Sequence, residues 1–177
     1  LLVVALSVLG GAVAAAIAIF ASVDGGIGGL GEIDAKDPAD VAALAEELEE
    51  FKGTTEVQSV GFYTDYVIVY LPFTSNPQDD RQISFTWKGG DKFDEWTRST
   101  SDQPTFDLAS IDTGVIAGMC DDVLRRAEGA TPDDCYIHLS KPGEGSKAWF
   151  RAFATDSFGR SVWAEFDKDG VLVGESE

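Results

Sequence analysis

Residues 148–173 read AWFRAFATDSFGRSVWAEFDKDGVLV, and this stretch decides the fold expected for the chain. Apolar and polar residues alternate along 148–155 and again along 160–167, which is the period of a half-buried strand. Asp169-Gly170 is a signal for a tight hairpin turn, and a further apolar strand is expected at 171–173. The stretch therefore predicts consecutive antiparallel strands.

The residues before this stretch complete a unit of one helix and four strands. Another strand is expected at 135–140, and a helix is expected before it. Asp112 or Thr113 is a suitable N-cap for that helix, and Gly129 suits the position after it. Its apolar stripe consists of Val115, Ile116, Met119, Val123 and Ala127.

The same order of elements occurs earlier in the chain. Asp37 and Pro38 begin a helix whose apolar residues recur at helical spacing up to Phe51, and Gly53 ends it. Strand-like segments follow at 57–62, 66–71, 82–87 and 92–97. We therefore predict an α+β fold that repeats a helix plus a four-stranded antiparallel sheet, with units at 37–104 and 105–177.

Residues 1–23 contain no charged side chain. A helix of this length spans roughly 33 Å, about the thickness of a bilayer's hydrocarbon core, so we predict an N-terminal transmembrane helix followed by a Gly-rich acidic tether at 24–36. A secretory signal peptide is the alternative, but the apolar run is long for that class. Acidic residues after the span favour a single-pass protein of the cell membrane with an extracytoplasmic C-terminal domain.

Small residues recur on neighbouring faces of the predicted span. Close approach of a second helix needs such residues four positions apart, so this face is a candidate for docking onto other membrane protein subunits. The alternative is that small residues are simply common in membrane spans. The candidates are Ser7, Gly10, Gly11, Ala14, Ala15 and Ala18.

The chain is strongly acidic, with 31 acidic residues, 13 basic residues and a net charge of −18. Nucleic acid, another polyanion, is excluded as a partner, whereas a basic extracytoplasmic protein would be attracted. Cys120 and Cys135 are expected to form a disulfide, because closing a loop of about 15 residues contributes roughly 3 kcal/mol on the chain-entropy description.

The sequence contains no catalytic constellation. His138 is the only histidine, and neither G-x-S-x-G nor S-x-x-K accompanies it. The G-x-G-x-x-G at 26–31 follows an apolar span instead of a strand, and Asp167 to Gly170 lacks the later ligands of a calcium loop. We therefore expect no catalytic residue, no metal ligand, no cofactor and no enzymatic activity.

Strand alternation assigns side chains to two faces of the predicted sheets. One face carries Val67, Val69, Leu71, Ile137, Leu139, Phe150, Ala152, Val162, Ala164 and Phe166. The other is rich in Trp, Tyr and Arg, the composition of a protein-binding hot spot. Its candidate partner-binding residues are Tyr66, Tyr70, Trp149, Arg151, Phe153 and Trp163. The alternative is that the two sheets pack together and bury these aromatic residues.

Residues 148–173 also resemble the closing hairpins of PepSY-type extracytoplasmic modules, in which a strand ends in an acidic residue and an Asp-Gly turn precedes an apolar strand. The repeated helix-plus-four-strand layout is similar to that of β-lactamase-inhibitor-protein-like tandem domains. The resemblance implies a protein that binds or inhibits other proteins and is not an enzyme.

Two functional hypotheses follow. The first is a non-catalytic single-pass accessory subunit that docks through its helix and acidic outer domain onto a larger membrane complex, with a respiratory-chain assembly as the specific prediction. The second is a membrane-tethered inhibitor or regulator of an extracytoplasmic enzyme such as a peptidase.

Overall fold

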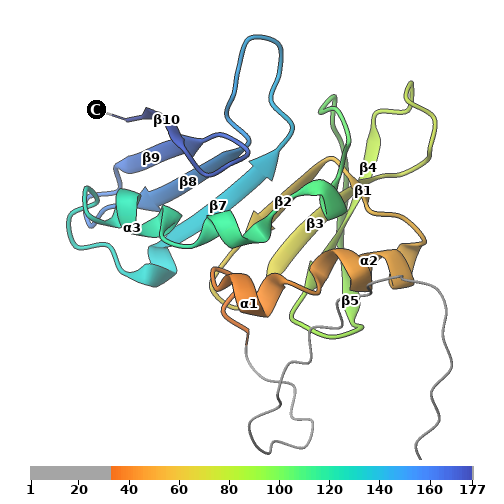
Figure 1. Ribbon diagram of the computed structural model, residues 1–177, viewed down its shortest axis with the longest axis horizontal. Coiled ribbons are helices and arrows are strands. Elements are labelled where there is room, and N and C mark those ends of the chain that lie inside the picture. Colours follow the sequence, from red (N-terminus) through yellow and green to blue (C-terminus); the bar gives the residue numbers. More distant parts are fainter. Residues whose placement is uncertain (1–32, 177) are drawn as a thin grey trace, which may run out of the picture.

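The computed structural model describes residues 33–176, and its centre is one antiparallel sheet of eight strands (Figure 1). The strand order across the sheet is β10-β9-β8-β7-β2-β3-β4-β5. The strands are β2 (Ser59–Phe62), β3 (Val67–Pro72), β4 (Arg81–Trp87), β5 (Phe93–Thr100), β7 (Cys135–Ser140), β8 (Phe150–Thr155), β9 (Ser161–Phe166) and β10 (Leu172–Glu175). Two short strands, β1 (Glu56–Val57) and β6 (Phe106–Asp107), pair as a second, two-stranded sheet.

The eight strands follow one another as two antiparallel meanders that meet in the middle of the sheet. The first meander runs through β2, β3, β4 and β5, and the second runs through β7, β8, β9 and β10. Each meander contributes its first strand to the junction, where Phe62 of β2 pairs with Ile137 of β7 and Ser59 pairs with Ser140. We call this β2–β7 ladder the seam.

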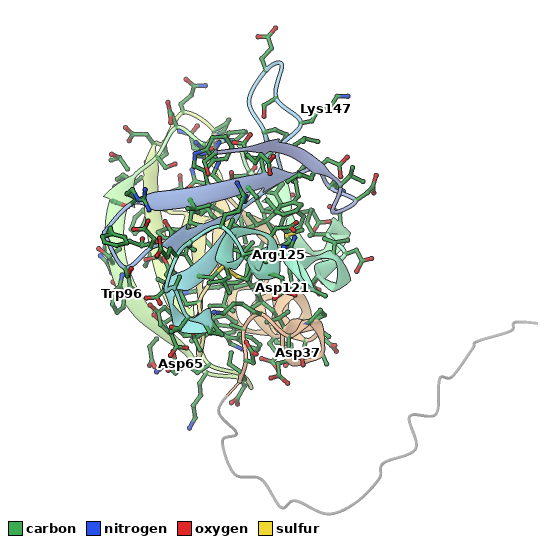
Figure 2. All side chains as sticks on the ribbon, turned by 90° about the vertical axis from the view of Figure 1, so that its left-hand side faces the viewer. Asp37, Asp65, Trp96, Asp121, Arg125 and Lys147 are labelled. Carbon is green, nitrogen blue, oxygen red and sulfur yellow. A yellow bond between two sulfur atoms is a disulfide. The ribbon has the colours of Figure 1, made fainter. Side chains whose placement is uncertain are left out.

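Short helices cover one face of the sheet (Figure 1). They are α1 (Pro38–Val41), α2 (Leu44–Lys52), α3 (Met119–Leu124) and the 3₁₀ turns η1 (Leu108–Ser110), η2 (Thr113–Ile116) and η3 (Pro132–Asp134). The Asp37 side chain, labelled in Figure 2, caps α1 by accepting a hydrogen bond from the Ala39 N–H, and Gly53 ends α2 in the left-handed conformation. A disulfide joins Cys120 of α3 to Cys135 of β7, the pair that the sequence indicates.

The core lies between these helices and the sheet. Every second residue of the central strands points into it, as strand geometry requires. The largest side chains with almost no exposed surface are Trp87, Phe62, Phe150, Leu44, Leu48, Leu108, Ile116, Ile137 and Leu139. The indole of Trp87 donates its N–H to the Glu47 carboxylate at 2.6 Å, so the polar atom of this buried ring is satisfied.

The predicted repeat of helix plus four-stranded sheet is wrong as an architecture. The seam merges what were expected to be two four-stranded sheets into one eight-stranded sheet, and the helices cover one of its faces (Figure 1). The helices are also shorter than predicted. The first is broken between Val41 and Leu44, and the second is reduced to α3, because Gly118 adopts a left-handed conformation with φ +77° directly before it.

The membrane predictions are also corrected. No helix within residues 33–176 is long and apolar enough to cross a membrane. The span predicted at 1–23 lies outside the described residues, as do its docking candidates Ser7, Gly10, Gly11, Ala14, Ala15 and Ala18. The structure therefore does not support the transmembrane helix, the single-pass cell-membrane location or the extracytoplasmic placement that was derived from them.

Candidate functional site: the open sheet face and the adjoining loops

The sheet face opposite the helices, here called the open face, carries a row of aromatic side chains. Phe153 pairs with Trp163 across β8 and β9, and Tyr136 pairs with Phe153 across β7 and β8. The rings of Tyr136 and Phe153 stack with centroids 5.0 Å apart, and the Tyr136 and Tyr63 rings stack at 5.5 Å. Tyr66 continues the row at 4.6 Å from Tyr63. These five residues form the aromatic row.

The row crosses the seam because a glycine leaves space for it. Gly61 lies on β2, between His138 of β7 and Ile68 of β3. A Cβ atom at this position would come within 3.0 Å of the Tyr63 ring, which is tighter than ordinary contact. The turn that follows is closed by the Tyr63 N–H, which donates to the Tyr66 carbonyl at 3.0 Å. Gly61 therefore lets the Tyr63 ring lie over the junction of the two meanders.

All four tyrosines of the chain belong to this region: Tyr63, Tyr66, Tyr70 and Tyr136. Burial raises the pKa of Tyr63 and of Tyr70 above the ordinary value, and the nearby Tyr66 phenol raises both further. The hydroxyl groups of Tyr63 and Tyr70 are therefore protonated at neutral pH. They offer the open face both hydrogen-bond donors and acceptors.

The cations of the open face are already engaged. Arg151 forms an ion pair with Glu165 on the neighbouring strand, and its guanidinium lies 5.7 Å from the Trp163 ring centroid. At the other end of the row, Lys88 is 4.0 Å from the Asp65 carboxylate. The face therefore offers apolar and aromatic surface without free positive charge from these residues.

His138 lies on the same face, beside the aromatic row. It pairs with Gly61 on one side and with Arg151 on the other. Burial lowers its pKa, and the positive charge of Arg151 lowers it further. Within residues 33–176 no group of three His, Cys, Asp or Glu side chains could hold a metal ion.

We expect the single histidine to titrate below its ordinary pKa of 6.5. The unfolded chain then takes up a proton more readily than the folded chain, so stability falls as the pH drops below 6.5. One imidazole resonance, followed by NMR against pH, measures the midpoint directly. Arg151→Met is expected to raise the His138 pKa, because it removes the neighbouring cation. A titration midpoint of His138 at or above pH 6.5 in the wild type would contradict its buried position beside Arg151.

The structure brings most of the predicted partner-binding residues together. Tyr66, Tyr70, Arg151, Phe153 and Trp163 share the open face. Trp149 does not join them.

The Trp149 side chain packs on the edge of the core, with its ring edge-on to Phe106 at 5.6 Å and Lys168 over it at 5.3 Å. The candidate set contained neither Tyr63 nor Tyr136. Strand alternation placed Tyr136 on this face, but its stack with Tyr63 depends on the seam, a pairing between segments far apart in the chain.

Three loops gather at one end of the sheet (Figure 1). They are the β3–β4 loop at 73–80, the connection at 101–105 that leaves β5, and the β7–β8 loop at 141–149. Antiparallel pairing places them there, because β3, β5 and β7 all end on the same side of the sheet.

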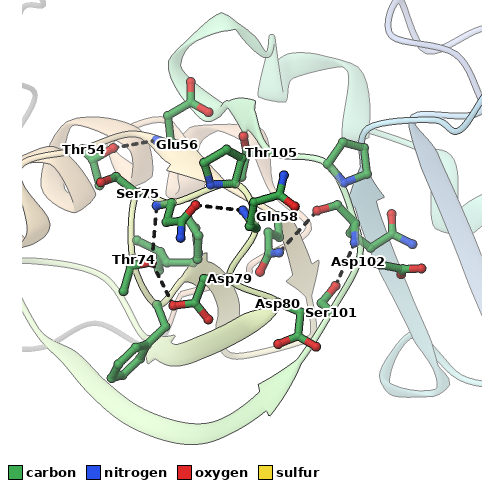
Figure 3. A pocket seen from close by; sticks show the side chains of 18 residues that line it. Thr54, Glu56, Gln58, Thr74, Ser75, Asp79, Asp80, Ser101, Asp102 and Thr105 are labelled. Carbon is green, nitrogen blue, oxygen red and sulfur yellow. Dashed lines mark hydrogen bonds between the residues drawn. The ribbon is translucent and has the colours of Figure 1, made fainter.

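Two of these loops enclose a cavity of about 700 Å³, here called the loop pocket (Figure 3). It is lined by residues 54, 56, 58, 71–80 and 101–105. Asp79 organises the 73–80 loop by accepting hydrogen bonds from Thr74 Oγ1 at 2.9 Å and from the Arg81 guanidinium at 2.7 and 2.8 Å. These bonds hold the Asp79 pKa well below its ordinary value.

Comparison with known proteins adds no identification. No family model matches the sequence, and no match was found among the curated proteins or the solved structures. The resemblance to PepSY-type and β-lactamase-inhibitor-protein-like modules therefore remains a prediction from the sequence.

Proposed function

We propose that this protein is a non-catalytic binding subunit whose open face docks onto a basic protein within a larger complex. The observation that carries the proposal is the aromatic row, which runs across both meanders on the face that the helices leave uncovered. Aromatic side chains supply large contact areas with few rotatable bonds, so they concentrate binding energy at protein interfaces.

The charge of the chain supports a basic partner. The net charge is −18, so long-range attraction favours proteins of opposite charge and disfavours acidic ones. Lys or Arg side chains of such a partner would meet the faces of the stacked rings, where cation–π attraction adds to burial. Arg151 and Lys88 are already paired with Glu165 and Asp65, so they would repel the partner little.

The test is recovery of a partner by the full-length tagged protein from its native cells, quantified by mass spectrometry. Tyr136→Ala/Phe153→Ala is expected to weaken binding of a basic protein about 100-fold or more, since hot-spot residues each contribute about 2 kcal/mol or more. The matched control is Phe158→Ala, because Phe158 is 73% exposed in the turn between β8 and β9.

Loss of the same basic protein from the double variant, with retention by the Phe158→Ala control, supports the proposal. Binding to that protein should also weaken as salt is raised, because screening reduces attraction between exposed charges. An unchanged set of bound proteins in the double variant would show that the open face is not the docking surface.

A further inference from the structure

The loop pocket contains a buried hydrogen-bond acceptor that has no partner. The Gln58 side chain lines the pocket and is only 5% exposed, and Figure 3 shows it between the two enclosing loops. Its Nε2 donates to the Gln103 carbonyl at 3.3 Å, while its Oε1 has no hydrogen-bond partner among the described residues. A buried polar atom without a partner is destabilising, so a hydrogen-bond donor bound at this oxygen would be favourable.

The orientation of the Gln58 amide follows from its surroundings. Turning the amide over would place Oε1 against the Gln103 carbonyl oxygen, and two acceptors would then face each other. The acceptor is therefore the end of the amide that has no partner. A ligand that satisfies it must carry an N–H or O–H donor.

The charge of the pocket lining favours a positively charged ligand. Four of its 18 lining residues are acidic, Glu56, Asp79, Asp80 and Asp102, and none is Lys, Arg or His. Asp79 is paired with Arg81. The carboxylates of the other three make no ion pair with any residue in 33–176. No set of three acidic, His or Cys groups in this part of the chain is arranged to hold a metal ion, which favours an organic cation.

We infer that the loop pocket binds a guanidinium group, either on an arginine side chain of a partner or on a small guanidinium compound. Guanidinium carries five N–H donors in one plane, so it can donate hydrogen bonds to several acceptors that lie apart from one another. It is also more weakly hydrated than ammonium, so moving it from water into the pocket costs less free energy. Water hardly reaches Gln58 Oε1, so a guanidinium N–H that donates to this oxygen forms a hydrogen bond there without displacing one to water.

The same loop already holds one guanidinium in this way. Arg81 makes a two-bond contact with Asp79, and its guanidinium carbon lies 4.8 Å from the centroid of the Phe73 ring. Carboxylate and flat apolar surface are combined again inside the pocket, which Pro72, Pro77 and Pro104 line together with the acidic residues.

The experiment is an NMR titration of the ¹⁵N-labelled full chain with n-butylguanidinium, with n-butylammonium as the chemical control. We expect saturable shifts of the Gln58 side-chain amide and of backbone amides in 73–80 and 101–105. Glu56→Gln/Asp102→Asn should weaken binding about tenfold, as expected for loss of charge-assisted hydrogen bonds. Asp94→Asn/Glu144→Gln removes the same charge elsewhere and should leave binding unchanged.

A blocked Gly-Arg-Gly peptide separates the two sources of the group. Tighter binding of the peptide than of n-butylguanidinium indicates an arginine side chain, and weaker binding indicates a small compound. No saturable shift, equal binding of n-butylammonium, or equal weakening by the two double variants would each overturn the inference. Tyr136→Ala/Phe153→Ala should retain guanidinium binding, so failure of face docking and failure of this site are distinguishable.

Discussion

Replacement of Phe62 by alanine is expected to lower the free energy of unfolding by about 3–5 kcal/mol. Phe62 is fully buried on β2, where it pairs with Ile137 across the seam and with Val67 on the other side. Removing its ring leaves a cavity at the junction of the two meanders, where both lose packing. Urea denaturation followed by circular dichroism measures the loss. Phe158→Ala, at an exposed ring, should change stability by no more than about 0.5 kcal/mol.

The position of Phe62 also predicts how the protein unfolds. The chain has four tryptophans, two in the first meander (Trp87 and Trp96) and two in or beside the second (Trp149 and Trp163). With 5-fluorotryptophan incorporated, their four ¹⁹F signals should disappear at the same urea concentration, because the seam makes one sheet of both meanders. Loss of one pair of signals before the other would mean that the halves unfold separately.

Loss of the Cys120–Cys135 disulfide is expected to lower stability by about 3 kcal/mol. The bond closes a loop across 15 residues of sequence, and the loss follows from the chain entropy that the unfolded protein regains. For a protein of this size the melting temperature should fall by roughly 6–12 °C. The measurement compares thermal melts of the wild type and Cys120→Ala/Cys135→Ala, each with and without reductant.

The double variant is its own control for the action of the reductant, since it has no disulfide to lose. Reductant should lower the melting temperature of the wild type and leave that of the variant unchanged. If thiol titration showed complete reduction of the wild type while its melting temperature stayed the same, α3 would not depend on this crosslink.

The local part of the fold could be predicted from the sequence, because it depends on short periods. Alternation along 148–155 and 160–167 matches β8 and β9 closely, and Asp169-Gly170 does form the turn before β10. The helices were overestimated, because the apolar stripe at Val115 to Ala127 continues across Gly118, whose left-handed backbone interrupts the helix. Periodicity reports which face is buried, but it does not report where the backbone changes conformation.

The non-local part could not be predicted in the same way. Nothing in Ser59–Phe62 or Cys135–Ser140 alone shows that these two strands pair, and without that pairing Tyr63 and Tyr136 have no reason to be considered together. The loop pocket depends on the same kind of information. Gln58 and Gln103 are 45 residues apart, and only the path of the connection at 101–105 brings them into contact.

The parts of the chain before and after the 101–105 connection pair with each other in two separate ladders. β1 pairs with β6 and β2 pairs with β7, so each side of the 101–105 connection supplies one strand to each of two antiparallel ladders. A backbone cut in this connection would leave two pieces that share both ladders and the core beneath them. Two such fragments would therefore have to pair along both ladders to restore the native sheet.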